Sequence, residues 1–232
     1  MGVTLSLSGC VYLRLNTLKN QLAQFPEYFS VKQRKAPTLV YKNPVLYSDD
    51  MQWLTGLKPS SIQTTLRGTL QRYVFRKLNA PQKENKDIVS TLLFRDDKLS
   101  EVVFPKRFKN FITMKNFVEM FSPIKDARIT KRSKKTEWKW REMYIKLPTI
   151  KKLSEYLGKP TRREEKPGRI TLTYDYQLER SDGPHTYIPE FQMVFTFWEY
   201  NAKVKETEVN LGRLWMFIDV SKEEKLVKVK RN

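Results

Sequence analysis

Residues 89–104 read VSTLLFRDDKLSEVVF and contain the clearest secondary-structure signal in the chain. Two apolar runs, rich in residues that favour strands, flank the charged segment Arg95-Asp96-Asp97-Lys98. Aspartate tolerates the backbone conformations of tight turns, so a short charged segment between two such runs predicts a β-hairpin. This hairpin makes antiparallel pairing the starting expectation for the whole chain.

Further signals lie on both sides of the hairpin. Residues 28–47 are predicted to be extended and interrupted by Pro37 and Pro44, which suits edge strands. Ser48 and Thr149 are the expected N-caps of two short helices. The other predicted elements are strands at 71–78, 138–141, 169–178, 191–200 and 203–220, and helices at 48–57, 107–122 (between Pro105 and Pro123) and 149–158. Residues 221–232 are expected to form a charged, frayed tail.

Two stretches share a layout that predicts an internal repeat. The first helix ends in LTGLKPS (54–60) and the second in YLGKPT (156–161), and each is followed by three predicted strands. Tyr73 follows Pro59 by 14 residues, and Tyr174 follows Pro160 by the same distance. The offset of about 101 residues predicts two related units, 28–105 and 106–220. We therefore predict an α+β fold of antiparallel sheets covered by short helices, because a one-sided sheet needs such cover.

The second stretch has a helix, then Leu-Gly-Lys-Pro-Thr, then a tyrosine-containing strand and a hairpin. This order resembles the units of the small outer-membrane lipoproteins of the barrel-assembly machinery. The β-lactamase inhibitor protein repeats a similar unit twice. The resemblance covers residues 48–104 and 148–218. It implies a fold and a binding role, with no catalytic residues to carry over.

The composition narrows the function classes. Lys and Arg number 44 against 25 Asp and Glu, a formal net charge of +19, which implies anionic surroundings or an acidic partner. A basic, solvated surface with no such partner remains the alternative. One cysteine and one histidine exclude an intramolecular disulfide framework and zinc sites built on several thiolates or histidines. No apolar run is long enough to span a membrane.

The single cysteine lies in a short recognisable motif. Residues 7–10, Leu-Ser-Gly-Cys, match the bacterial lipobox, in which the thiol of Cys10 receives a lipid. Residues 10–27 would then hold the anchor and an amphipathic helix (12–25) that ends at Pro26. Residues 1–9 would be the end of a longer signal, because nine residues cannot hold its charged and apolar regions. The start at Cys10 also resembles uncharacterised proteobacterial lipoproteins.

Two other interpretations of this start stay open. Residues 1–6, Met-Gly-Val-Thr-Leu-Ser, fit the N-myristoylation pattern, with Cys10 as a palmitoylation site. Alternatively, Cys10 is a buried, inert thiol.

The segment TKRSKKTEWKWR (130–141) supports a different class of function. Its cations interleave with tryptophans, as in surfaces that bind single-stranded nucleic acid. Strand alternation, however, predicts tryptophans on one face and charges on the other. The candidate binding residues are Lys131, Arg132, Lys134, Lys135, Trp138 and Trp140.

No catalytic motif is found in the sequence. His185 is expected in a solvated loop, and the paired acids at 49–50, 96–97 and 164–165 are explained by capping and solvation. The sequence therefore predicts a non-enzymatic binding or scaffold module without cofactor or metal. We expect it to be lipid-anchored, periplasm-facing and at the outer membrane of the bacterial envelope, with anionic lipid or an envelope protein as partner. The alternative is a soluble, basic nucleic-acid-binding protein.

Overall fold

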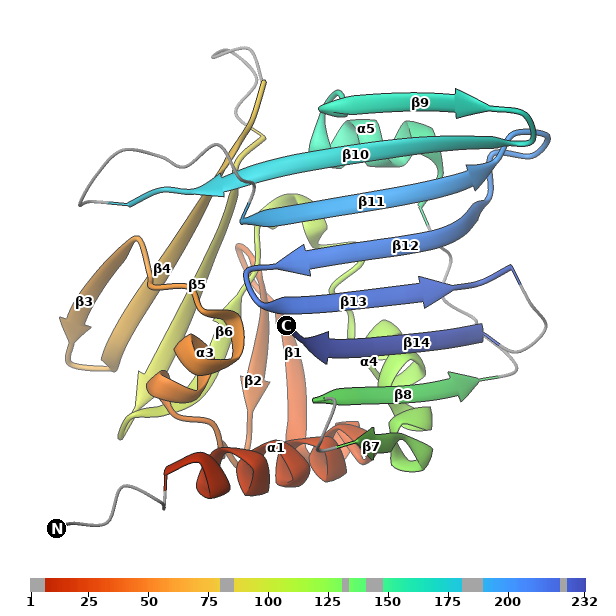
Figure 1. Cartoon of the computed structure of the whole chain (residues 1–232). Helices are drawn as coiled ribbons and strands as arrows, with labels where there is room; N and C mark the ends of the chain where they lie inside the picture. Colours follow the sequence, from red (N-terminus) through yellow and green to blue (C-terminus); the bar gives the residue numbers. More distant parts are fainter. Residues whose placement is uncertain (1–6, 80–85, 131–133, 141–147, 181–189, 222–224) are drawn as a thin grey trace, which may run out of the picture.

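The computed structural model describes residues 7–79, 86–130, 134–140, 148–180, 190–221 and 225–232. Its strands form one large antiparallel sheet, so the predicted α+β class with antiparallel pairing is confirmed (Figure 1). In order across the sheet they are β1 (Phe29–Gln33), β2 (Pro37–Tyr41), β6 (Lys98–Val103), β5 (Ile88–Arg95), β4 (Gly68–Lys77), β10 (Arg169–Leu178), β11 (Phe191–Trp198), β12 (Val204–Leu211), β13 (Leu214–Asp219), β14 (Lys225–Arg231), β8 (Lys135–Trp140) and β7 (Arg128–Thr130).

The hairpin predicted at 89–104 is formed by β5 and β6. Its two turn residues, Asp96 and Asp97, have φ values of 51° and 60°. Positive φ at both central residues is the requirement of the turn that best matches the twist of a hairpin. Aspartate is among the few residues other than glycine that adopt it readily, so the local sequence determines this turn.

The two halves of the sheet meet where β4 and β10 pair. Residues 176–178 of β10 lie opposite residues 77–75 of β4, with Arg76 and Gln177 at the centre. An offset of 101 relates position 75 to 176 and position 77 to 178, so exchanging the halves maps this junction onto itself. Beside it, β3 (Ser61–Thr65) pairs with the start of β4, and β9 (Arg162–Lys166) pairs with the start of β10.

Hydrogen bonds to side chains repeat at the same offset. The hydroxyl of Ser60 accepts from the backbone N–H of Val74 at 3.0 Å, and the hydroxyl of Thr161 accepts from the N–H of Asp175 at 2.9 Å. Each hydroxyl ties the loop after a helix to the following long strand. Both halves therefore use a small hydroxyl residue after proline for the same structural purpose.

The second hairpins also match. The pairing of β5 with β6 shifts register between Leu93 and Phe94, and that of β11 with β12 shifts between Thr196 and Phe197. Such bulges increase the local twist of a strand pair. Figure 1 shows β4–β6 running steeply across the direction of β10–β14, and this change of direction falls where β4 and β10 pair.

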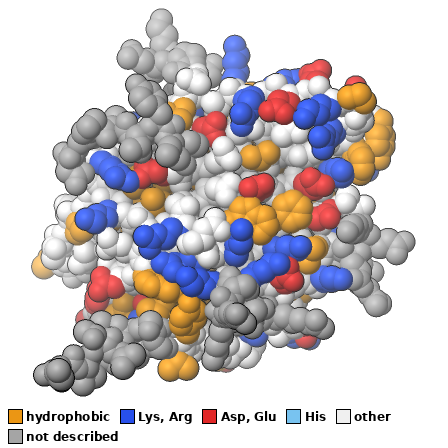
Figure 2. Space-filling view, in the orientation of Figure 1, with side chains coloured by type: hydrophobic (Ala, Val, Ile, Leu, Met, Phe, Trp, Pro, Cys, Tyr) orange, Lys and Arg blue, Asp and Glu red, His pale blue; other side chains and the backbone are white. Residues whose placement is uncertain are grey.

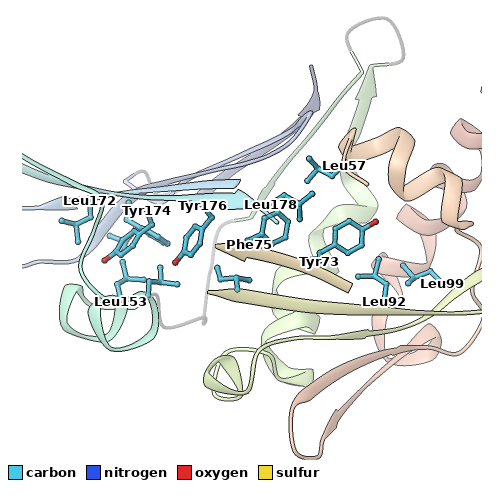
Figure 3. Packing of buried hydrophobic residues seen from close by; sticks show 14 of the residues in the cluster. Leu57, Tyr73, Phe75, Leu92, Leu99, Leu153, Leu172, Tyr174, Tyr176 and Leu178 are labelled. Atoms are coloured by element: carbon cyan, nitrogen blue, oxygen red, sulfur yellow. The ribbon is translucent and has the colours of Figure 1, made fainter. Parts of the chain in front are cut away.

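Two short helices cover one face of the sheet, which we call the core face. They are α3 (Ser48–Thr55) and α5 (Ile150–Leu157). Figure 3 shows Leu153 of α5 against the side chains of β10, with Phe75 and Leu178 continuing the cluster towards Tyr73. The largest side chains with less than 2% exposure include Tyr174, Tyr176, Phe94, Phe197, Leu99, Leu172 and Leu178. One continuous core therefore joins the two halves.

The N-terminal segment forms a second, aromatic cluster. It comprises α1 (Leu7–Ala23), α2 (Phe25–Tyr28) and β1, and it packs on α4 (Met114–Phe121). The ring of Phe25 stacks on Phe29, Phe117 and Phe121 at centroid distances of 4.6, 5.2 and 5.8 Å. Because Phe25 is only 1% exposed, this cluster fixes the N-terminal segment on the rest of the fold.

The prediction of one continuous helix at 107–122 is wrong in its extent. The structure has a 3-10 turn, η1 (Lys106–Phe108), then α4, then a second 3-10 turn, η2 (Ser122–Asp126), which contains Pro123. Thr113 begins α4 because its hydroxyl accepts from the backbone N–H of Asn116 at 3.2 Å. A side-chain cap inside the apolar stripe therefore divides it.

The frayed tail predicted at 221–232 is also wrong. Residues 225–231 form β14, which pairs with β13 on one side and β8 on the other. Val227 is 1% exposed and belongs to the core face with Trp138 and Ile124. The charged residues alternate with apolar ones, so β14 buries one face although its composition is polar.

Two predicted helix ends differ in detail. Ser48 is the first residue of α3, and the N-cap is Tyr47, whose backbone N–H donates to the carboxylate of Asp50 at 2.9 Å. Pro26 does not simply end a helix, because it lies in the first turn of α2, where a missing N–H costs nothing. Thr149 caps the start of α5 as predicted, and Gly158 is its C-cap.

Candidate binding face

The face of the sheet opposite the core face is built by alternation along β12, β13, β14 and β8. In β13, Met216 and Ile218 pack towards the core cluster of Trp138 and Val227. Successive side chains of a strand point to opposite faces. Trp215 and Phe217 therefore lie on the other, open side.

Trp215 and Phe217 form an aromatic pair. Their ring centroids are 5.8 Å apart and their planes differ by 2°. The indole Nε1–H of Trp215 donates to Oε1 of Glu208 at 2.8 Å, and the amide of Asn210 donates to the same oxygen at 3.0 Å. A hydrogen-bonded indole holds one orientation, so the pair is a preformed surface for contact.

Charged rows border the aromatic pair on either side. The acidic row is Glu206 and Glu208 on β12, and in the sheet register Glu208 lies opposite Phe217. On the other side Lys228 and Lys230 of β14 lie opposite Phe217 and Trp215. Figure 2 shows this order: hydrophobic side chains lie between acidic groups and a band of Lys and Arg. We call this surface the banded face; its residues are Glu206, Glu208, Trp215, Phe217, Lys228, Lys230, Lys135, Glu137 and Lys139.

The basic row is held in place by contacts within the chain. The ammonium of Lys230 lies 5.1 Å from the centroid of the Trp215 ring. Glu137 of β8 lies 2.5 Å from Lys135 and 3.7 Å from Lys228. The hydrogen bond from Lys135 and the nearby positive charges lower the pKa of Glu137. Glu137 therefore stays ionised and organises the row at neutral pH.

The sequence-predicted binding residues are not brought together on this surface. Trp138 is 7% exposed and packs in the core, where its indole N–H has no hydrogen-bond partner among the described residues. Lys135 is part of the basic row, and Lys134 is exposed at the turn before β8 with φ 51°. Trp140 ends β8, but its side chain lies outside the described residues, as do Lys131 and Arg132.

Trp138 therefore cannot stack on a base, because the core covers it. Alternation predicted the separation of tryptophans and cations, and the burial of Trp138 agrees. Sequence reasoning missed Trp215, Phe217, Lys228 and Lys230. Their signals were the alternating pairs Trp-Met-Phe at 215–217 and Lys-Val-Lys at 228–230.

A separate feature lies near Cys10, which is part of α1 although its side chain is outside the described residues. Leu13, three positions later, is 70% exposed. The ring of Tyr12 meets Trp53 edge-on at 5.6 Å, and the guanidinium of Arg231 lies 3.9 Å from the centroid of Trp53. Tyr12, the residue before the exposed Leu13, thus contacts a tryptophan ring on which a cation is stacked.

A buried ion pair attaches this end of α1 to α3. Asp50 is 1% exposed, and both its oxygens accept from the guanidinium of Arg14, at 2.6 Å to Nε and 2.5 Å to Nη2. A two-point contact between Arg and a carboxylate fixes orientation as well as distance. The position of α1 is therefore tied to that of α3.

The paired acids named from the sequence lie in a helix start, a turn and an exposed strand. No group of three or more His, Cys, Asp or Glu side chains there could hold a metal ion. Asp96 and Asp97 are turn residues, and Glu165 pairs with Arg163 at 2.5 Å on the exposed strand β9. His185 lies outside the described residues.

Among those same residues, no helix is both long and apolar enough to cross a membrane. Comparison of the chain with protein-family models, with curated proteins and with solved structures found no match.

Proposed function

We propose that the protein is a membrane-anchored, non-enzymatic binding module of the bacterial cell envelope, with a lipid on Cys10. The observation that carries the proposal is Leu13, which is 70% exposed three residues after Cys10 on the same helix. A large exposed leucine is unfavourable in water, but it gains burial where an acyl chain draws the helix to a bilayer. The lipobox at 7–10 and this apolar residue support the same anchor.

The residue before Leu13 makes contacts that suit a membrane surface. Trp and Tyr prefer the interface between lipid and water, and Tyr12 lies in contact with Trp53. Arg231, stacked on Trp53, adds a positive charge that attracts anionic headgroups. Because Arg14 binds Asp50, the anchor helix is held against the body of the protein, which would therefore lie close to the bilayer.

The two halves of the sheet are, in this proposal, related units of the kind found in the small lipoproteins of the barrel-assembly machinery and in the β-lactamase inhibitor protein. The support is the junction that maps onto itself and the paired hydroxyls of Ser60 and Thr161. Such units present sheet surfaces to partners. The banded face is the surface that we propose for binding, at the outer membrane and facing the periplasm.

Metabolic labelling tests the anchor. The gene is expressed in its own cells with a labelled fatty acid, as the parent and as Cys10→Ala and Gly2→Ala variants. We expect label on the parent and on Gly2→Ala, and none on Cys10→Ala. Loss of label in Gly2→Ala would indicate N-myristoylation instead. No label on the parent, or label that survives Cys10→Ala, would contradict the proposal.

A second candidate function is binding of single-stranded nucleic acid, favoured by Trp215 with Lys230 above its ring. The acidic row ranks this function lower, because Glu206 and Glu208 would repel phosphates along one side of the same aromatic pair. A salt titration with a generic single-stranded oligonucleotide tests it. Affinity that falls steeply with salt supports the function, and absence of binding at low salt ends it.

A further inference from the structure

We infer that the banded face binds the banded face of a second copy of this chain, with a two-fold axis that lies in the interface along β13. The inference concerns the folded body and does not depend on the anchor at Cys10. It follows from the order of the three rows, acidic on β12, aromatic on β13 and basic on β14, which the pairing register fixes.

The symmetry operation explains why this order is self-complementary. Rotation by 180° about β13 turns the face over and exchanges its two sides, while positions along the strand are kept. Glu208 in the acidic row of one copy then lies opposite Lys228 in the basic row of the other, and the aromatic row meets itself. An interface of this kind is isologous: every contact occurs twice.

The register also predicts which residues meet. Glu208 and Lys228 both lie opposite Phe217 in the sheet, on its two sides. In the dimer, Glu208 of one copy therefore faces Lys228 of the other, and Trp215 and Phe217 face their own counterparts. Aligned packing of two twisted sheets, at a separation of about 10 Å, brings these side chains into contact.

Other partners fit the face less well. A polyanion would be attracted to the basic row but repelled by the acidic row, and an acidic protein would meet the same conflict. A second copy pairs Glu208 with Lys228 twice and covers the aromatic pair, while Glu206 lies opposite Leu226 and Lys230 lies opposite Asn210. Charge complementarity therefore favours self-association over a partner of a single charge sign.

Charge exchange provides a stringent test. Both variants are made in a Cys10→Ser background, which has no thiol at position 10 to receive a lipid. One variant carries Glu206→Lys with Glu208→Lys, and the other carries Lys228→Glu with Lys230→Glu. Each should raise the dimer dissociation constant about 100-fold or more, because like charges then meet twice. An equimolar mixture of the two should restore a dimer, since every contact again joins opposite charges.

Matched controls change the same net charge away from the face. Lys151→Glu with Lys152→Glu on α5 matches the second variant, and Glu164→Lys with Glu165→Lys on β9 matches the first. Both controls should remain dimeric in analytical ultracentrifugation. If they dissociate like the face variants, net charge and not the face controls association, and the inference fails.

Two outcomes would overturn the inference directly. The first is a Cys10→Ser chain that stays monomeric in a concentration series up to about 1 mM, which would reveal even weak complexes. This measurement needs no face variant, so it holds even if a charge exchange disturbs folding. The second is a mixture that stays monomeric although both variants melt like the parent. A monomer that binds oligonucleotide through Trp215 would assign the face to nucleic acid instead.

Discussion

The sheet halves on either side of the junction between β4 and β10 agree near that junction and differ away from it. β4 and β10 are each ten residues long, and Tyr73 and Phe75 of one correspond to Tyr174 and Tyr176 of the other on the core face. Beyond the second hairpins, the first half continues into β2 and β1, and β1 belongs to the aromatic cluster of Phe25. The second half continues into β13, β14 and β8, which carry the banded face.

This difference shows that residues near the junction and residues away from it are constrained in different ways. Near the junction, side chains of both halves share one core, so each half constrains the other. Away from it, the second half has a face that the core does not need, and aromatic and charged residues occupy it in rows. Variants of corresponding residues can therefore test whether the halves are energetically alike and where they diverge.

The largest expected effect comes from the corresponding core residues Phe94 and Phe197. They are 1% and 0% exposed, and each follows the bulge of its hairpin. Phe94→Ala and Phe197→Ala should each lower the free energy of unfolding by about 3–5 kcal/mol, through lost burial and the cavity. Urea unfolding followed by circular dichroism measures this.

Because the core is continuous, each of these variants should unfold in a single transition. Two transitions in either variant would mean that the halves unfold independently. Leu66→Ala serves as the control, since Leu66 lies fully exposed in the turn after β3 and should change stability by less than about 0.5 kcal/mol.

Different interactions stabilise the helices that cover the two halves: an ion pair for α3 and an N-cap for α5. Arg14→Leu leaves the buried carboxylate of Asp50 without its partner and should cost about 3 kcal/mol. In the other half, Thr149→Ala removes only the N-cap of α5 and should cost about 1 kcal/mol.

Thermal melts in both backgrounds give the difference between these helices. The double variant Arg14→Leu with Asp50→Leu should recover part of the loss, because no unpaired charge is then buried. A double variant as unstable as Arg14→Leu alone would show that packing around Arg14, and not charge, is responsible.

Most of the local structure could be predicted from the sequence, but little of the long-range arrangement of the strands could. Turn residues such as Asp96 and Asp97 and caps such as Thr149 act within a few positions, so the hairpin and α5 were predictable. The strand at 225–231 was missed because its neighbours, β8 and β13, are distant or separated by a loop, and its composition is charged. Trp138 was placed on the correct side by alternation, but the identity of the open aromatic pair needed the register of β13 with β14.

Alkaline pH should expose the contribution of the buried tyrosines. Burial raises the pKa of Tyr73 and Tyr174 to about 12, and it raises the pKa of Tyr176 further. Below pH 10 each phenol is protonated in both states. Between pH 10 and 12 only the unfolded chain loses the proton, so stability should fall by about 1.4 kcal/mol per pH unit for each tyrosine. Urea titrations at pH 8, 10 and 11 measure this slope. A free energy of unfolding that does not change over this range would contradict the burial of these tyrosines.

Tyr176 differs from its counterpart Phe75 by one hydroxyl group. That hydroxyl is buried and has no hydrogen-bond partner among the described residues. Tyr176→Phe removes it and makes the second half like the first, so it should stabilise the protein by about 1 kcal/mol at neutral pH. The variant should also lose less stability above pH 10. A destabilised variant would mean that the hydroxyl has a partner of its own.

The smallest expected effect on stability concerns Glu137 on the banded face. The charged row that contains it has no counterpart in the matched hairpins. The pKa of Glu137 is lowered chiefly by the hydrogen bond from Lys135, so its contribution is present above pH 4.5 and is lost as the pH falls through the lowered pKa. Glu137→Gln should therefore cost less than about 1 kcal/mol at pH 7, because the group is partly exposed and screened by solvent. The difference from the parent should vanish in acid, as measured by paired urea titrations from pH 7 to pH 3. A difference that persists in acid would show that Glu137 acts through packing, and the basic row would then be fixed by Trp215 instead.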